Sequence, residues 1–267
     1  FMAARVIAVA NQKGGVGKTT TAINLAASLA LVERRVLAVD VDPQANLTSG
    51  IGLKGQSSSQ GTLYEALTAK TIPDFSGFVL QTTVSGLSVV PAERNLTGAE
   101  LEMVSLENRE KRLRSLVKQL VDRYDYVFID TPPSLGLLTL NGLVAADTVL
   151  IPMLSEYFAL EGLAELVSTL QRVRASLNPS LDIEGVLLTM HDGRTNLSQQ
   201  VSREIREFFK AKVFDTVIPR NVRLGEAPSH GLPAILYDKK SRGAKAYVSL
   251  AKEILNKDSI TLREKYD

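Results

Sequence analysis

The sequence predicts an α/β protein with a doubly wound, mostly parallel sheet that is covered by helices on both faces. Three observations lead to this prediction. Apolar, β-branched runs alternate with helical patterns along the chain, as in sheets whose strands are joined by helical crossovers. A glycine-rich segment directly follows the first apolar run, and two later runs end in aspartates. Glycines and carboxylates at strand ends are typical of ligand sites in open α/β sheets.

Each predicted element follows from its own pattern. Short runs of Val, Ile, Leu, Ala and Phe indicate strands that are buried on both faces. The segment after the glycine-rich loop has Ile23, Ala26, Ala27 and Ala30 at helical spacing, which predicts a helix over 21–31. Strands are predicted near 5–10, 35–40, 87–90, 126–130, 147–152, 184–189 and 214–218, with helices between most of them.

We expect residues 1–267 to form a single domain, because doubly wound folds often reach this length without splitting. Phe1 precedes Met2 and is interpreted as a cloning remnant, so residues 1–4 are expected to be a flexible N-terminus. Residues 256–267 are expected to be a C-terminal tail. The Ser- and Gly-rich stretch Lys54–Gly61 is expected to be a surface loop.

The glycine-rich segment has the features of a phosphate-binding loop. Glycines let successive backbone N–H groups turn inward at the start of a helix, where they hold phosphate oxygens. Lys18 is predicted to reach the β- and γ-phosphates of a nucleotide, and the Thr19 hydroxyl to ligate Mg²⁺. The predicted nucleotide-binding residues of this loop are Lys13, Gly14, Gly15, Val16, Gly17, Lys18, Thr19 and Thr20.

The loop departs from the standard pattern G-x-x-x-x-G-K-[ST] at its first position, and it carries an additional lysine where that pattern accepts any residue. Gln12 stands where that pattern has its first glycine, and Lys13 adds a second lysine near the front of the loop. The side chain of Lys13 is long enough to reach its own nucleotide or the phosphates of a neighbouring subunit. A glycine-rich turn with two solvated lysines is the alternative, but the strand before the loop and the helix after it argue against that alternative.

Carboxylates follow two of the predicted strands. Asp40 and Asp42 close the run that begins at Val36, and Asp130 closes the run Tyr126–Ile129. Asp42 is predicted to orient the attacking water in phosphoryl transfer, and Asp130 to hold Mg²⁺ through a water molecule. A lone aspartate after a strand is more often a helix cap, but three of them behind a phosphate loop favour the nucleotide site.

Composition excludes some classes of protein. The chain has no cysteine, which rules out structural disulfides and thiolate-held metal clusters. No apolar run is long enough to cross a bilayer. The net charge is only +2, but residues 190–267 hold 15 Lys and Arg against 10 Asp and Glu. This basic C-terminal part is a modest indication of a surface that binds phosphate backbones.

Four blocks together resemble a known family. They are the loop 13–20, the segments Asp40–Gln44 and Asp130–Ser134, and the pair Met190–Leu197 and Ile218–Gly231. The chain resembles the deviant Walker A ATPases, and within them the ParA/Soj partitioning ATPases, over roughly residues 5–255. The resemblance implies a P-loop fold, ATP and Mg²⁺ as cofactors, and Lys13, Lys18 and Asp42 as the catalytic residues. It also implies that Lys13 contacts nucleotide across a homodimer that encloses two ATP molecules.

The same resemblance assigns roles to C-terminal residues. It implies that Pro219 and Arg220 lie near the adenine, and that Arg194 and Arg223 bind DNA without sequence preference. A salt bridge to Glu226 is the alternative role for Arg223, and a solvated turn is the alternative for Arg194. Apart from the resemblance, the charge pattern gives a second basic cluster, which is expected to contribute to DNA binding less than the two arginines and consists of Lys239, Lys240, Arg242 and Lys245. His191 and His230 are expected to be surface or packing residues.

The resemblance implies a switch protein. An ATP-dependent homodimer would bind non-specific double-stranded DNA, and a ParB-type centromere-binding partner would stimulate weak ATP hydrolysis to drive chromosome or plasmid segregation. A cytoplasmic, nucleoid-associated location follows. A MinD-like membrane-positioning ATPase is the alternative, although residues 255–267 offer few apolar anchors for a membrane. A metabolic P-loop enzyme is a further alternative, for which no acceptor site can be identified in the sequence.

Overall fold

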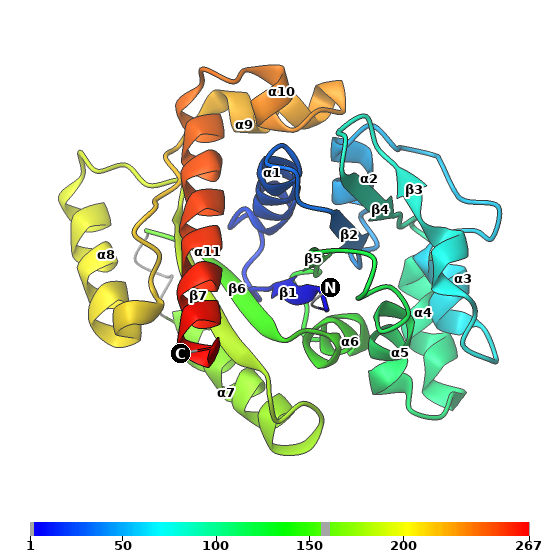
Figure 1. Cartoon of the computed structure of the whole chain (residues 1–267). Coiled ribbons are helices and arrows are strands. Elements are labelled where there is room, and N and C mark those ends of the chain that lie inside the picture. The colour runs from blue at the N-terminus through cyan, green and yellow to red at the C-terminus, as the bar shows by residue number, and fades with distance from the viewer. Residues whose placement is uncertain (1–2, 156–160, 267) are drawn as a thin grey trace.

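The computed structural model describes residues 3–155 and 161–266. In this part of the chain, a seven-stranded sheet has the order β3-β4-β2-β5-β1-β6-β7 (Figure 1). Neighbouring strands run parallel, except that β3 and β4 are antiparallel. The strands are β1 (Arg5–Val9), β2 (Val36–Asp40), β3 (Leu80–Gln81), β4 (Leu87–Val90), β5 (Tyr126–Asp130), β6 (Thr148–Leu154) and β7 (Asp182–Thr189). The predicted doubly wound, mostly parallel sheet is confirmed.

Helices cover both faces of this sheet (Figure 1). On one face lie α1 (Lys18–Ala30), α2 (Asn46–Gly50), α9 (Val222–Glu226), α10 (Ala234–Tyr237) and α11 (Arg242–Tyr266). On the other face lie α3 (Leu63–Thr68), α4 (Leu96–Glu102), α5 (Arg112–Val117), α6 (Leu137–Ala145), α7 (Glu161–Ser176) and α8 (Asn196–Phe209). The described 3₁₀ turns are η1 (Phe75–Phe78), η2 (Met103–Ser105), η3 (Arg109–Lys111), η5 (Lys210–Lys212) and η6 (Ala227–His230).

The central strands are buried on both sides, as their continuous apolar runs predict. In β1, Val6 and Ala8 belong to the core under α3–α8, whereas Ile7 and Val9 belong to the core under α1 and α11. Successive side chains of a strand point to opposite faces, so one run serves two cores. Burial of both faces fixes the positions of the strand ends that carry the loop and the carboxylates.

The predicted strand at 214–218 is wrong as a regular strand. This segment runs beside β7, and the Phe214 and Ile218 N–H groups donate to Val186 and Leu188 at 3.0 and 2.8 Å. Two of the three N–H groups between them, those of Asp215 and Thr216, donate instead to the carboxylate of Glu253 in α11. A side chain therefore takes the hydrogen bonds that a strand ladder would need.

Three further differences lie at the sheet edge and the chain ends. The short antiparallel strand β3 was not predicted, because two residues give no periodicity. Ala4, expected to be flexible, is buried, and its N–H donates to the Val121 carbonyl at 2.7 Å. Residues 256–266, expected to be a tail, continue α11. Phe1 and Met2 lie outside the described residues.

None of the described helices has both the length and the apolar character needed to cross a membrane.

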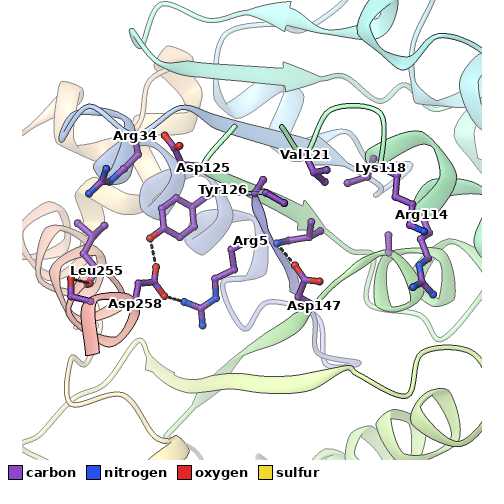
Figure 2. Close-up of a pocket in the computed structure, with 16 residues that line it drawn as sticks. Arg5, Arg34, Arg114, Lys118, Val121, Asp125, Tyr126, Asp147, Leu255 and Asp258 are labelled. Carbon is purple, nitrogen blue, oxygen red and sulfur yellow. Dashed lines mark hydrogen bonds and ion pairs between the residues drawn. The ribbon is translucent and has the colours of Figure 1, made fainter. Parts of the chain in front are cut away.

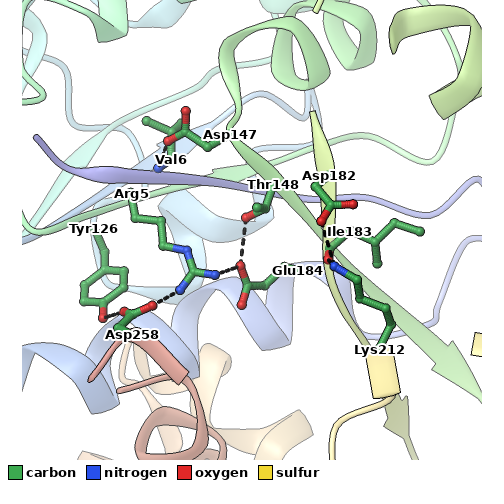
Figure 3. A network of polar contacts seen from close by, with 10 residues as sticks. All are labelled: Arg5, Val6, Tyr126, Asp147, Thr148, Asp182, Ile183, Glu184, Lys212 and Asp258. Carbon is green, nitrogen blue, oxygen red and sulfur yellow. Dashed lines mark hydrogen bonds and ion pairs between the residues drawn. The ribbon is translucent and has the colours of Figure 1, made fainter. Parts of the chain in front are cut away.

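A polar network ties the end of α11 to the N-terminal edge of the sheet (Figure 3). Arg5 forms ion pairs with Asp258 of α11 and with Glu184 of β7. Tyr126 donates to Asp258, and the Thr148 hydroxyl donates to Glu184 at 2.9 Å. The Glu184 side chain is only 1% exposed, so Arg5 supplies the charge that its burial requires. A cavity of about 760 Å³ opens beside this network, at the end of β1 opposite the glycine-rich loop (Figure 2).

The network predicts that loss of Arg5 destabilises the fold more than loss of Lys212. Arg5→Ala leaves the buried Glu184 without its ion pair, so we expect the free energy of unfolding to fall by about 2–4 kcal/mol. Lys212→Ala removes a more exposed pair with Asp182 and should cost less than about 1 kcal/mol. Urea unfolding of both variants measures the difference. Equal losses for the two variants would contradict a structural role for the Arg5 network.

Candidate nucleotide-binding site

The glycine-rich loop joins the C-terminal end of β1 to the first turn of α1. Gly15 and Gly17 have φ angles of 72° and 87°, a left-handed conformation that costs glycine no steric strain. Gly17 is also the N-cap of α1, which begins at Lys18. The unpaired N–H groups of this helix start are therefore directed toward the loop, as an anion site requires.

Two side chains outside the predicted set hold the loop in place. The Asn11 amide donates to the Pro152 carbonyl of β6 at 2.8 Å, and its oxygen accepts from the Lys13 N–H at 3.0 Å. The buried Thr189 hydroxyl lies 2.8 Å from the Val16 carbonyl oxygen and 3.1 Å from that of Met153. Sequence reasoning missed Asn11 and Thr189. Their only signal was a polar residue at the end of an apolar run.

Lys18 is buried within the loop. Its ammonium group donates to the Lys13 carbonyl at 3.0 Å. Burial lowers the pKa of Lys18, although the nearby carboxylates of Asp130 and Asp42 oppose this shift. The lysine is thus held between the loop backbone and the strand-end carboxylates, where a phosphate group would meet its charge.

Thr19 and Asp130, the two residues predicted to hold Mg²⁺, are in contact with each other. The Thr19 hydroxyl donates to Asp130 Oδ2 at 2.7 Å. Asp130 is fully buried, and its other oxygen has no hydrogen-bond partner. Burial, followed by the charge of Asp40, raises the pKa of Asp130 well above its usual range. Asp40 and Asp130 are register partners across β2 and β5, so the sheet itself places these two carboxylates side by side.

Asp40 and Asp42, at the end of β2, lie in different environments. Asp40 accepts hydrogen bonds from the Thr48 hydroxyl at 2.7 Å and from the N–H groups of Thr48 and Asp42. Burial raises the pKa of Asp40 to about 6. Asp42 is nearly buried and accepts from the Gln44 N–H at 2.9 Å. Asp40 therefore anchors α2, which leaves Asp42 as the carboxylate beyond the strand end.

The donor set suits Mg²⁺. This ion is held in proteins by one or two carboxylates together with hydroxyl, water and phosphate oxygens. Asp130 offers a buried oxygen with no partner, and the Thr19 hydroxyl lies against it. Among the described residues, no group of three or more His, Cys, Asp and Glu side chains forms a metal cage. The site thus fits a cation that takes most of its ligands from water and a nucleotide.

The other predicted nucleotide residues lie near the same edge. Pro219 is paired with His191, just beyond the end of β7. The His191 N–H donates to the Ile218 carbonyl at 3.0 Å, and the Arg220 N–H donates to the His191 carbonyl at 3.3 Å. The segment carrying Pro219 and Arg220 is therefore fixed beside the strand that contacts the loop through Thr189.

The two predicted DNA-binding arginines are exposed and carry ion pairs. Arg194 binds Asp192 through two nitrogen–oxygen contacts of 2.7 and 2.8 Å, and its side chain is 88% exposed. Arg194 holds the pKa of Asp192 below its usual range. Arg223 contacts Glu226 at 2.7 Å and Asp238 at 3.5 Å. The salt bridge to Glu226 considered for Arg223 is thus present.

Pairing of the backbone brings the two arginine segments to one place. Arg194 follows His191 by three residues, and Arg223 follows Arg220 by three, so both segments leave the sheet at the His191–Pro219 pair. The second basic cluster, consisting of Lys239, Lys240, Arg242 and Lys245, is exposed at the start of α11. There α11 lies beside α9 and α10 (Figure 1).

A phosphate loop at a helix start, with its lysine and its strand-end carboxylates, defines a P-loop nucleotide-binding protein. A family model described as an AAA domain matches residues 4–183. The chain is 54% identical to the chromosome partitioning protein ParA of Myxococcus xanthus, over 96% of this chain and 89% of that protein. It is 53% identical to the sporulation initiation inhibitor protein Soj of Bacillus subtilis, over 94% and 98% of the two chains.

Solved structures agree with the fold. Cobyrinic acid a,c-diamide synthase from Mycobacterium smegmatis, solved with ADP and magnesium, superposes with a TM-score of 0.81 at 36% identity, over 94% of each chain. The chain belongs to the ParA/Soj family of chromosome-partitioning ATPases.

The raised pKa of Asp40 gives a pH-dependent prediction. The pKa is about 6 in the folded protein and 3.8 as the reference value, so ionisation of Asp40 weakens the fold as pH rises from about 4 to about 6. The Asp40→Asn variant lacks this ionisation. We expect its stability relative to wild type to rise by up to about 3 kcal/mol between pH 4 and pH 7.

Urea unfolding in EDTA without nucleotide, at a series of pH values, measures this difference. Loss of the second Asp40 oxygen also weakens the contacts to Thr48, so the two proteins differ at every pH. A stability difference that stays constant across the series would contradict the assigned environment of Asp40.

Proposed function

We propose that this chain is an ATP-dependent dimerisation switch for chromosome or plasmid segregation, formed by one P-loop ATPase domain over residues 1–267. Its ATP-bound dimer binds non-specific duplex DNA, and a ParB-type partner stimulates hydrolysis. The observation that supports the proposal is the pairing of His191 with Pro219, because the two exposed arginine segments both continue from this pair, just beyond the end of β7. Family membership supports the segregation role.

ATP and Mg²⁺ are the cofactors that the site fits. The backbone of 13–20 holds the phosphates, Lys18 contacts the β- and γ-phosphates, and Thr19 with Asp130 holds the metal ion. Mg²⁺ neutralises charge that develops on the phosphates. The solved structure with ADP and magnesium supports this assignment. Pro219 and Arg220 are assigned to the base, beside the end of β7.

Hydrolysis is assigned to Asp42. Its carboxylate stands beyond β2, whereas Asp40 is committed to Thr48 and Asp130 to Thr19. An acceptor at this position orients a water molecule toward the γ-phosphate, and Lys18 stabilises charge on the leaving oxygens. Asp42 and Lys18 act by positioning and charge, and no covalent intermediate with the enzyme is formed. We expect the resulting turnover to be slow, so that a partner can accelerate it.

Lys13 is assigned to the dimer. Its N–H is fixed by Asn11 and its carbonyl by Lys18, so the backbone is held while the side chain remains available for contacts beyond the loop. A cation at the front of the loop can reach the phosphates of a facing subunit. ATP then closes two subunits because the γ-phosphate gives Lys13 a partner that ADP lacks.

DNA is assigned to Arg194 and Arg223, with Lys239, Lys240, Arg242 and Lys245 as a second cluster. The two arginines keep exposed ion pairs, which stabilise the fold little, so DNA phosphates can compete for them at little cost. The ATP-bound dimer presents twice as many cations to DNA as a single subunit does. DNA therefore binds the dimer more tightly and favours the ATP-bound state. The protein is expected in the cytoplasm on the nucleoid.

Binding of a non-specific duplex with ATP, ADP or no nucleotide tests the proposal. We expect binding only with ATP and a loss of about tenfold or more in affinity between 50 and 200 mM salt. Arg194→Ala and Arg223→Ala should each weaken binding and reduce the salt dependence. Asp192→Asn should strengthen binding, because it frees Arg194 from its ion pair.

Lys118→Ala is the matched control, since it removes an exposed cation from the end of α5, away from the arginine segments. It should leave DNA binding unchanged. If wild type ignores DNA in every nucleotide state, the proposed switch fails. Sedimentation with vesicles would then test the membrane-positioning alternative.

A further inference from the structure

His191 has polar contacts that the proposed chemistry does not use. Its Nδ1 atom lies 3.0 Å from the Ser155 hydroxyl, 3.0 Å from the Ser198 hydroxyl and 3.4 Å from the Ser202 hydroxyl. Ser155 follows β6 directly, whereas Ser198 and Ser202 belong to α8. One half-buried imidazole therefore joins the end of a central strand to the helix that follows Arg194.

The backbone of His191 joins a third segment. Its N–H and C=O pair with Ile218 and Arg220, so side chain and backbone together connect β6, α8 and the segment 218–220. Groups with several fixed partners on different elements move only when those elements move together. His191 is thus placed where a change in strand position would reach the turn 192–195.

A short path leads from the nucleotide loop to His191. Thr189 contacts the Val16 carbonyl of the loop, and only Met190 separates Thr189 from His191. Met190 has a φ angle of 48°, a left-handed conformation that is strained for a residue with a side chain. Strain of this kind persists where the surrounding contacts hold it, and it is common at switch regions.

The turn beyond His191 carries Arg194. Thr195 caps α8 by accepting from the Ser198 N–H at 3.3 Å, and the Gln199 amide donates to the Gly193 carbonyl at 2.7 Å. Ser198 thus takes part both in the helix cap and in the His191 cluster. A shift of His191 would be transmitted to the cap and to the turn that positions Arg194.

We propose that His191 is a positioning residue that couples the nucleotide loop, through Thr189 and Met190, to the turn 192–195 and its Arg194. The coupling rests on the proposed function in taking ATP as the ligand of the loop. Binding of phosphates shifts the Val16 carbonyl, and the Thr189–His191 segment passes this shift to the start of α8. His191 itself contacts neither nucleotide nor DNA.

Hydrogen exchange of the amides of residues 191–199 tests this coupling without DNA. In wild type, saturating Mg·ATP should slow exchange in this segment by about threefold to tenfold. His191→Leu keeps the approximate volume but removes the polar contacts, so the ATP effect should disappear. His191→Asn restores a polar atom near the position of Nδ1 and should recover the effect. ATP affinity is measured for each variant so that exchange is compared at equal saturation.

DNA binding gives the second readout. We expect His191→Leu to weaken ATP-dependent duplex binding by about tenfold per dimer, and His191→Asn to remain within about twofold of wild type. Thermal unfolding without ligand checks that the Leu variant is folded. Retention of either the exchange effect or ATP-dependent DNA binding in folded His191→Leu would overturn the inference.

The two proposals can fail separately. If wild type shows the exchange effect but binds no DNA, the proposed DNA switch fails and the coupling through His191 stands. If Arg194→Ala abolishes DNA binding while His191→Leu does not, the switch stands and the coupling is overturned. An absence of any ATP effect on residues 191–199 in wild type also overturns the coupling.

Discussion

The structure depends on how three carboxylates share one buried sheet edge. Parallel pairing of β2 with β5 sets Asp40 beside Asp130, and Asp42 follows two residues beyond Asp40. Neighbouring buried carboxylates repel and cannot all ionise cheaply. Thr48, Thr19 and Lys18 relieve part of this cost through hydrogen bonds and charge. Asp130 still keeps one oxygen without a partner. A bound cation would offset the repulsion between these carboxylates and give the free Asp130 oxygen a partner. Binding of Mg²⁺ and nucleotide is therefore expected to stabilise this edge of the sheet.

Contacts from this edge also reach both of the segments that carry Arg194 and Arg223. Asp40 holds α2 through Thr48, and α2 packs against η6, where Gly52 lies close to the backbone of Gly231. The η6 turn is continuous with α9, which carries Arg223. On the other side, Thr189 and His191 connect the loop to the turn of Arg194. Each arginine segment thus has its own route of contacts to the nucleotide site, and both routes begin at strand ends that burial holds fixed.

The sequence predicted the sheet, six of its strands and the loop, because these depend on local patterns: continuous apolar runs, glycine spacing and carboxylates at strand ends. It failed where a distant side chain decides the local structure. Glu253 diverts the N–H groups of Asp215 and Thr216 from the edge of β7, and nothing within 214–218 signals this. Asn11, Thr189 and the serines around His191 were missed for the same reason, since their partners are remote in sequence. The ion pairs of Arg194 with Asp192 and of Arg223 with Glu226 are local, and the second of these was considered from sequence spacing alone.

Thermal unfolding of wild type and Asp130→Asn, each with and without Mg·ATP at pH 7, tests the central claim most directly. Substitution removes the carboxylate whose pKa burial raises, so the variant should be more stable than wild type without ligand. With Mg·ATP the order should reverse, because wild type gains binding energy that the variant loses. A variant that is less stable without ligand, or one that gains as much from Mg·ATP as wild type does, would contradict the account.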